Sequence, residues 1–484
     1  MWRMIQSGIQ VLSGGASLAC LAAEPLTLAD FQQRIVETHP AFAAEVLQVA
    51  VAEKRRDALR GGEDWILFAS PFYRDEEPVS SSTFSPTDQQ LFGADLSLSR
   101  PVWNTGGRVG FSLNYDYADQ ETPLIEIPGA VSGMGLVISE PSFHRHRALI
   151  TYLHPLLRNH GGIQDRLEYD LRDLDVRLSE LQTLENREDL LLEMSSKYLD
   201  WVLLVEQLRI VRGREQLAVD QYEESARRRA QNLVDEVDVL RAENGVQVAR
   251  QRTVLTQARA RAAQRELEIL VGLEEDGTRM PGFALYETSE HPGVDESWYA
   301  SSRLMRTLDT LRDQLRRRML SLADGERARL DLVLSGGLAS GDASYGDSAE
   351  FDRPEAQIGL QFSVPLGNRT MKREAEATLL ELQKIHKQEE HVRLQLKAAL
   401  ENVHIQMGEL EKVIELNRKQ VNAAKKQTAE ERKAYDQGRS PLTFVIQSRD
   451  GEARAENLHA ENAVQYQKLF LQYQALRDEL LPGD

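Results

Sequence analysis

The sequence EAQIGLQFSVPLGNRTMKREAEA, residues 355–377, joins an alternating stretch to the start of a very long helix. Its first ten residues alternate between apolar and polar or small side chains, and this period of two predicts a half-buried β-strand. Pro365 cannot donate a backbone hydrogen bond to a neighbouring strand, so it fits the end of the strand. Residues 369–436 contain no proline and one glycine. They predict a single helix of roughly 100 Å, longer than a compact globular domain needs.

The long helix also carries a repeating apolar pattern. Its apolar residues are spaced four and three residues apart, which is the spacing of a coiled-coil seam. The seam consists of Leu396, Leu400, Val403, Met407, Leu410 and Ile414.

The same strand-to-helix junction occurs earlier, in ALITYLHPLLRNHGGIQDR at residues 148–166. An alternating stretch again runs into Pro-Leu, a turn with asparagine and glycine, and a long helix. Each long helix then breaks, at 230–243 and 435–450, and returns as a second long helix. We therefore predict an internal duplication behind a signal peptide over residues 1–23. The first repeat covers 24–293, with strands over about 64–155 and a helix pair over 163–271; the second covers 294–484, with strands over about 328–366 and a helix pair over 369–481.

These features resemble the TolC family of outer-membrane efflux proteins over roughly residues 26–482. The resemblance rests on LTLADFQQRIVETHPAF at 26–42, the two strand–Pro-Leu–helix junctions, NLVDEVDVLRAE at 232–243 and YDQGRSPLTFVI at 435–446. It implies a mainly α protein with β structure. Three copies would form a β-barrel in the outer membrane of a Gram-negative bacterium, continuing into a periplasmic α-helical coiled-coil barrel.

The same resemblance implies the function and the partners. The homotrimer would be a passive exit duct of a tripartite efflux or type I secretion system. Its partners would be a periplasmic adaptor (membrane-fusion) protein, an inner-membrane transporter and the lipid of the outer membrane. A periplasmic coiled-coil scaffold without a pore is the alternative, although a pure scaffold needs no amphipathic strands beside each long helix.

Composition excludes several other classes of protein. The net charge of −18 argues against nucleic-acid binding, because phosphate contacts require a cationic surface. One cysteine among 484 residues excludes an intrachain disulfide framework. No apolar run is long enough for a transmembrane helix, so a chain that spans a membrane would do so as a closed barrel. No phosphate loop, HExxH motif or nucleophile elbow is present, and we expect no enzyme activity and no cofactor.

The number of strands in each chain is a separate question. Four strand candidates lie in the first half of the chain and two in the second. The stretches 94–102 and 108–117 flank the turn Asn104-Thr105-Gly106-Gly107, which is typical of a hairpin. We predict that this hairpin belongs to the barrel wall, giving six strands in each chain. The alternative is an extracellular hairpin above a barrel with four strands from each chain.

The N-terminus contains a candidate lipidation site. Residues 1–23 have the basic, apolar and small-residue order of an export signal, with cleavage expected after Ala23. Cys20 follows Ser17-Leu18-Ala19, which is close to a lipoprotein cleavage box, and some members of the family are lipidated. The alternative is that Cys20 is removed with the signal peptide.

The two helix breaks are candidate contact sites for the adaptor. Gly438 supplies a left-handed backbone conformation that ends one helix, and Asn232 occupies the equivalent place in the first half. We expect both breaks to be tight turns at the periplasmic tip. Arg227, Arg228 and Arg229 precede the first break and fit either a docking patch or a solvated helix face.

The helix that follows the second break is the candidate gate. In the family, acidic residues at this position often ring the constriction, but here Phe444 and Gln447 occupy it. A threefold ring of Phe444 would constrict the pore sterically and by dewetting. Negative charge at the tip would come from Asp235 and Asp238 instead. The alternative is that Phe444 packs into the core of the helix pair.

Four histidines lie near the first strand-to-helix junction. His144, His146, His154 and His160 lie close in sequence, and the first two share one face of a strand. They could ligate a transition metal, but no cysteine or compact carboxylate set accompanies them. We therefore expect no metal site and interpret them as part of a polar barrel interior.

Overall fold

The computed structural model describes residues 25–481, apart from residues 78, 80–85, 87, 122–124, 127–134, 137–141, 277–278, 290–292 and 294–297. The chain forms two compact units, each built from separate stretches of sequence. One unit, here called the sheet unit, comprises residues 45–185 and 296–396. The other, here called the hairpin unit, comprises residues 1–44, 186–295 and 397–484.

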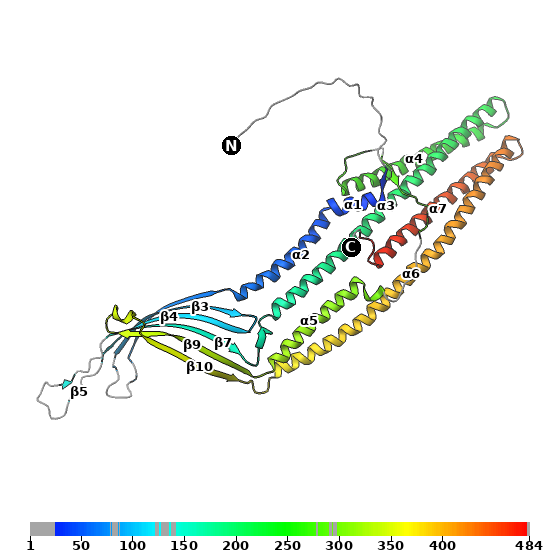
Figure 1. Ribbon diagram of the computed structural model, residues 1–484. Coiled ribbons are helices and arrows are strands. Elements are labelled where there is room, and N and C mark those ends of the chain that lie inside the picture. The colour runs from blue at the N-terminus through cyan, green and yellow to red at the C-terminus, as the bar shows by residue number, and fades with distance from the viewer. Residues whose placement is uncertain are drawn as a thin grey trace, which may run out of the picture. The chain divides into compact units, whose positions relative to one another are not determined.

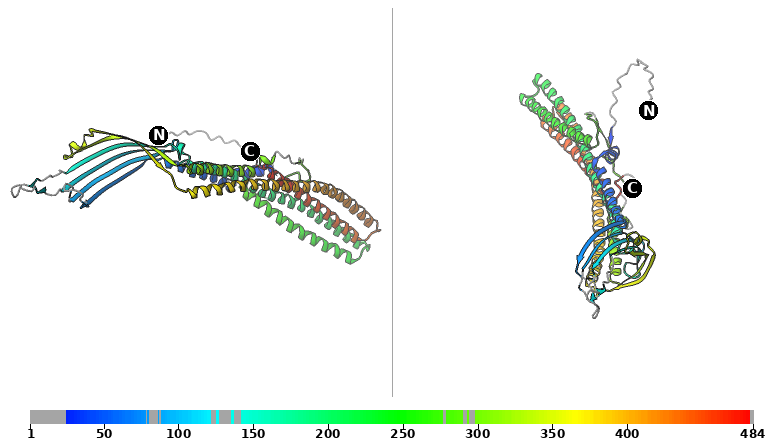
Figure 2. Two further views of the ribbon diagram at one scale, coloured as in Figure 1. Left: turned by 90° about the horizontal axis from the view of Figure 1, so that it is seen from below. Right: turned by 90° about the vertical axis from the view of Figure 1, so that its left-hand side faces the viewer.

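The sheet unit contains one curved, six-stranded antiparallel sheet (Figures 1 and 2). The strand order is β10-β9-β7-β4-β3-β2. The strands are β2 (Ile66–Glu76), β3 (Asp88–Val102), β4 (Gly107–Glu121), β7 (Phe143–Pro155), β9 (Arg329–Asp342) and β10 (Arg353–Ser363). The prediction of six strands is confirmed, because the hairpin β3–β4 lies inside the sheet between β2 and β7. An external hairpin is therefore wrong.

Several helices of the sheet unit lead into or out of these strands. They are α2 (Pro40–Ala58) with the 3-10 turn η1 (Leu59–Glu63), the first part of α3 (Leu167–Ala230), α5 (Arg303–Gly325) and the first part of α6 (Arg369–Asp436). Short elements complete it: η2 (His160–Gly162), η3 (Trp298–Ala300), η4 (Asp347–Ala349) and the two-residue strands β5 (Ile125–Glu126) and β6 (Gly135–Leu136). Helix α6 has the bounds predicted from its lack of proline and glycine.

The two strand-to-helix junctions use the same backbone device. Asn159, Gly161 and Gly162 have positive φ at the first junction, and Gly367 and Asn368 have positive φ at the second. The backbone N–H of Asn159 also donates to the buried carboxylate of Asp324 at 2.7 Å. Asparagine and glycine tolerate this region best, so these residues allow the chain to turn sharply from strand into helix.

The hairpin unit contains two long helical hairpins (Figure 1). The first pairs the end of α3 with α4 (Glu236–Leu270), and the second pairs the end of α6 with α7 (Leu442–Leu476). Helices α4 and α7 both have 35 residues. The unit also holds α1 (Leu28–Thr38) and a parallel pair of two-residue strands, β1 (Leu26–Thr27) and β8 (Pro281–Gly282).

Five of the six predicted seam residues of α6 are buried, and Leu410 is half-buried. Leu400 and Met407 are fully buried, and Val403 and Ile414 nearly so. The same row continues beyond the predicted residues through Asn417, Val421, Thr428 and Tyr435, all of which are buried. The coiled-coil pattern therefore extends to the end of the helix.

Candidate functional site

The sheet has one apolar face and one mostly polar face. Register across the sheet aligns Leu96, Leu113, Ala148 and Leu338 in one row of the apolar face. A row three positions further along points to the opposite face. On five strands it consists of small or polar side chains, namely Ser99, Gly110, Thr151, Ser335 and Gln357, and on β2 it holds Ile66. Strand β2 departs from this pattern, because Ile66 and Phe68 lie on the mostly polar face. Alternation on the other strands is typical of a sheet with apolar surroundings on one side and polar surroundings on the other.

The described part of the chain leaves the apolar face exposed. Ile358 is 80% exposed and Leu360 is 67% exposed on β10, and Phe362 is similarly open. The prediction of a half-buried strand is therefore wrong for the single chain. The alternation along β10 correctly separates the two faces of the strand. It does not show what covers either face. An apolar surface of this size requires a partner or a lipid environment.

Aromatic and histidine side chains border the apolar face at two levels. Near one end of the strands, ring centroids of one cluster lie between 4.6 and 6.1 Å apart. This cluster consists of Tyr115, Tyr117, His144, His146 and Tyr345. Near the other end, Trp65 lies 5.8 Å from Phe111, and Tyr152 lies 5.9 Å from His154.

The spacing of these levels matches the thickness of a membrane. His144 and His154 lie ten positions apart on β7, which is roughly 33 Å along a strand. A tilt of about 40° would reduce this to about 25 Å of height, the height of the apolar band of an outer-membrane barrel. Aromatic side chains concentrate at both borders of such bands.

His144 and His146 lie on a different face of the sheet from the one that the sequence analysis assigned to them. His144 and His146 do share one face, but register places them on the apolar face with Leu113 and Ala148, not on the polar one. The Nδ1 atom of His144 lies 2.9 Å from the hydroxyl of Tyr115. These contacts make the histidines part of an aromatic border rather than of a polar interior.

Both edges of the sheet are open. Within the described residues, β2 and β10 each pair with a strand on one side only, and each has 11 residues. Six antiparallel strands place the two edge strands in opposite directions. An edge of one copy can therefore pair in antiparallel fashion with the other edge of a second copy.

The two helix breaks have the same geometry, as the sequence predicted for Asn232 and Gly438. Their φ values are 56° and 69°. In the first break, Leu233 N–H donates to Arg228 O at 2.9 Å; in the second, Arg439 N–H donates to Ala434 O at 2.9 Å. This six-residue closure with a left-handed residue inside it is a Schellman motif. Both breaks are therefore tight turns.

The three arginines before the first break make different contacts. Arg227 is 68% exposed and pairs with Glu224 at 3.0 Å, and Arg229 pairs with Glu236 at 3.2 Å. The side chain of Arg228 is only 19% exposed, and its guanidinium lies 4.4 Å from the ring centre of Tyr435.

Arg228 therefore connects the two hairpins. Its Nη1 donates to the carbonyl of Tyr435 at 3.3 Å and its Nη2 to the carboxylate of Asp436 at 3.3 Å. No local pattern in the sequence indicates this contact, because Arg228 and Tyr435 lie 207 positions apart. The continued seam of α6 down to Tyr435 is the only related signal in the sequence.

The predicted gate residues occupy separate places near the tips. Phe444 is 49% exposed, whereas its neighbours Leu442 and Val445 are buried against Tyr435. Gln447 lines a cavity of the hairpin unit. Asp235 is the residue before α4 and makes no side-chain cap bond, and Asp238 pairs with Arg241 at 2.9 Å. A gate formed by these residues around a threefold axis stays a prediction. Cys20 and the signal peptide lie outside the described residues.

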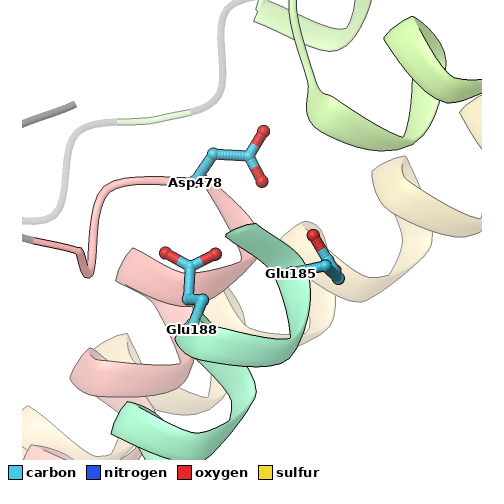
Figure 3. A group of neighbouring side chains, drawn as sticks. All are labelled: Glu185, Glu188 and Asp478. Carbon is cyan, nitrogen blue, oxygen red and sulfur yellow. The ribbon is translucent and has the colours of Figure 1, made fainter. Parts of the chain in front are cut away.

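Two carboxylates meet at the C-terminal end of α7. Oxygen atoms of Glu188 and Asp478 lie within 4.8 Å of each other (Figure 3, which also draws Glu185, one turn earlier on α3). Glu188 is buried and accepts a hydrogen bond from the backbone N–H of Leu480 at 3.0 Å. Asp478 has a left-handed backbone, with φ of 59°. Glu188 thus stabilises the turn that ends α7, which gives this carboxylate a structural role.

No helix within the described residues is both long and apolar enough to cross a membrane.

Comparison with known proteins identifies the fold. No protein-family model matches the chain, and no curated protein sequence matches it. Solved structures do match over nearly the whole chain. The outer membrane protein VceC of Vibrio cholerae is 11% identical, with a TM-score of 0.64 over 94% of this chain and 97% of VceC. The CmeC outer membrane channel of Campylobacter jejuni is 10% identical, with a TM-score of 0.63 over 99% of this chain and 96% of CmeC. The MtrE outer membrane channel of Neisseria gonorrhoeae is 14% identical, with a TM-score of 0.63 over 94% of this chain and 89% of MtrE.

The chain therefore has the fold of the outer-membrane channel proteins. The resemblance to the TolC family that the sequence indicated is confirmed at the level of the fold.

Proposed function

We propose that three copies of the chain form an outer-membrane exit duct. The observation that carries the proposal is the six-stranded sheet, with its open edges and its exposed apolar face between two aromatic borders. Edge-to-edge pairing of three copies would give a closed barrel of eighteen strands and remove every open edge. A barrel of that size leaves an aqueous channel, which the small and polar residues of the other face would line.

The helical hairpins would build the periplasmic part of the duct. Apolar residues remain exposed at heptad-related positions of α4, namely Leu255 and Ile269, fourteen residues apart. Ile405 and Leu416, eleven residues apart on α6, are also exposed. Repeats of seven and eleven residues each return to the same face of a helix, so these rows offer surfaces for neighbouring copies.

In this proposal the duct performs no chemistry and acts as a conduit. An inner-membrane transporter would supply the driving force, and a periplasmic adaptor would contact the tips at Asn232, Gly438, Arg227 and Arg229. The engagement of Arg228 with Tyr435 and Asp436 supports a different role for that residue, in holding the two hairpins of one chain together. Phe444, Gln447, Asp235 and Asp238 would form the gate.

A pore-free periplasmic scaffold is disfavoured by the sheet. A scaffold gains nothing from six strands whose apolar side chains are exposed, and in water such a surface would promote aggregation.

The test is to express the full-length gene in a Gram-negative host and to separate the membranes. The duct predicts a protein in the outer-membrane fraction that migrates as a trimer on a gel without heating and as a monomer after boiling. Recovery from the soluble periplasm as a species that does not change on boiling would support the scaffold instead.

A further inference from the structure

A cavity of about 710 Å³ lies inside the hairpin unit, between α3, α4 and α7. Its volume falls in the range of small-molecule binding sites. Part of its wall is apolar, through Ile210, Leu217, Val248 and Ile446. The cavity is distinct from the tip contacts described above, although Gln447 contributes to its wall.

The charged part of the wall is unusual for this chain. The chain carries a net charge of −18, yet six cationic and only three acidic side chains line the cavity. The cationic residues are Arg209, Arg214, Arg241, Arg252, Lys425 and Arg449, and the acidic ones are Asp450, Glu452 and Glu456. The cavity is therefore a cationic site in an acidic protein.

Most of these cations have carboxylate partners. Arg214 pairs with Asp450, Lys425 with Glu456 at 2.7 Å, Arg209 with Glu206 at 2.8 Å and Arg241 with Asp238 at 2.9 Å. Within the described part of the chain, Arg252 and Arg449 form no ion pair. Arg449 donates from Nη1 to the carbonyl of Leu217 at 2.9 Å, but its buried Nε has no acceptor.

The arginines also repel one another. Burial lowers the pKa of Arg449, Arg432 lowers it further, and Asp220 and Glu452 only partly offset these effects. Burial likewise lowers the pKa of Arg214, with Arg252 and Arg454 acting in the same direction. Guanidinium groups remain charged in proteins, so the site retains positive charge at an energetic cost that an anion would reduce.

We propose that this cavity binds an amphipathic organic anion, with its carboxylate or sulfonate at Arg252 and Arg449 and its apolar body against Leu217, Val248 and Ile446. Guanidinium groups bind such anions through paired N–H donors, and the apolar wall selects for an organic body over an inorganic ion. A bound anion would lie between the first hairpin and α7. It should therefore slow amide hydrogen exchange in residues 443–456 of α7.

The experiment uses two fluorescent probes that share one apolar body. The full-length protein in a neutral detergent is titrated with 8-anilino-1-naphthalenesulfonate and, separately, with N-phenyl-1-naphthylamine, which lacks the sulfonate. The same titrations without protein correct for the micelles. We expect saturable binding of one sulfonate per chain and at least tenfold weaker binding of the uncharged probe. A tenfold excess of sodium sulfate over the probe, at constant ionic strength, should displace little of the sulfonate.

Three variants locate the site. Arg252→Gln removes an exposed charge without disturbing packing and should weaken sulfonate binding about tenfold, the effect expected for one charge-assisted hydrogen bond. Arg449→Gln should weaken it at least as much, whereas Arg449→Lys should retain part of the affinity. Arg316→Gln is the control, because Arg316 lies on α5 in the sheet unit and pairs with Asp313.

Equal sulfonate affinity in Arg252→Gln, Arg449→Gln and the wild type would overturn the proposal. Equal affinity for the two probes would also overturn it, because the cavity would then bind the apolar body without any contribution from the anionic group. Absence of a saturable site would do the same.

Discussion

The turn between α6 and α7 depends on the left-handed backbone conformation of Gly438. A Cβ at this position would meet nothing within 4 Å, so substitution is limited by the φ of 69° alone. We predict that Gly438→Val destabilises the turn by about 1–2 kcal/mol, the cost of a left-handed conformation. Efflux in a susceptible host should weaken while the heat-sensitive trimer persists. Unchanged tolerance of the host to the transported compounds would contradict this prediction.

Asn232→Gly is the matched variant at the other tip. Glycine accepts the φ of 56° at least as readily as asparagine, so this change should leave both efflux and trimer formation intact. A loss of efflux in Asn232→Gly equal to that in Gly438→Val would show that the side chain at position 232, rather than its backbone, is needed.

His459 packs against the segment 281–289, and the stability of this contact depends on pH. Its ring lies 4.4 Å from that of Tyr286, whose hydroxyl donates to Glu206 at 2.8 Å. Burial lowers the pKa of His459; Glu206 opposes this effect and Arg418 adds to it. The free imidazole has a pKa of about 6.5 and takes up a proton more readily than the buried one. Stability from this contact is therefore present above about pH 6.5 and is lost as the pH falls towards the pKa of the folded state.

We predict that amide hydrogen exchange in residues 281–289, corrected for the intrinsic effect of pH, is faster at pH 5.5 than at pH 7.5. His459→Asn should remove most of this difference, because asparagine has no proton to gain. An equal pH response in the wild type and in His459→Asn would assign the effect to another group.

At the scale of elements, the sheet can be tested one face at a time. Ile150 and Thr151 are adjacent on β7, near the middle of the stretch between His144 and His154, and point to opposite faces. Arginine on the lipid-facing side of a barrel costs about 2–4 kcal/mol near the midplane, whereas lumen positions tolerate charge. We predict that Ile150→Arg reduces the trimer recovered from outer membranes and that Thr151→Arg does not. Equal recovery of both variants would mean that the apolar face does not contact lipid.

Elements with strong local patterns could be predicted from the sequence. The bounds of helix α6 could be predicted because its 68 residues contain no proline and one glycine. Most of the six strands could be predicted from their alternation. The pair β1–β8 was missed because two residues have no periodicity. The contact of Arg228 with Tyr435 and the cavity at Arg449 were missed because they join helices far apart in sequence. The face occupied by His144 was misread because the sequence does not say which face is polar across neighbouring strands.

At the scale of the molecule, the gate distinguishes a steric constriction from an acidic ring. Phe444 is half exposed, so a threefold ring of its side chains is compatible with the packing of α7. We predict that Phe444→Ala raises single-channel conductance more than Gln447→Ala does. Block by divalent cations should depend mainly on Asp235 and Asp238. Conductance that is insensitive to Phe444, or block that persists in Asp235→Asn/Asp238→Asn, would refute this gate.

The central claim is that three sheets close into one water-filled barrel. The most direct measurement is the current through a planar lipid bilayer after addition of the purified, unheated trimer. We predict uniform conductance steps, which should disappear when the same sample is boiled and should be rare with Ile150→Arg. A trimer that inserts into the bilayer without conductance, even as Phe444→Ala, or a sample that remains monomeric and never inserts, would contradict it.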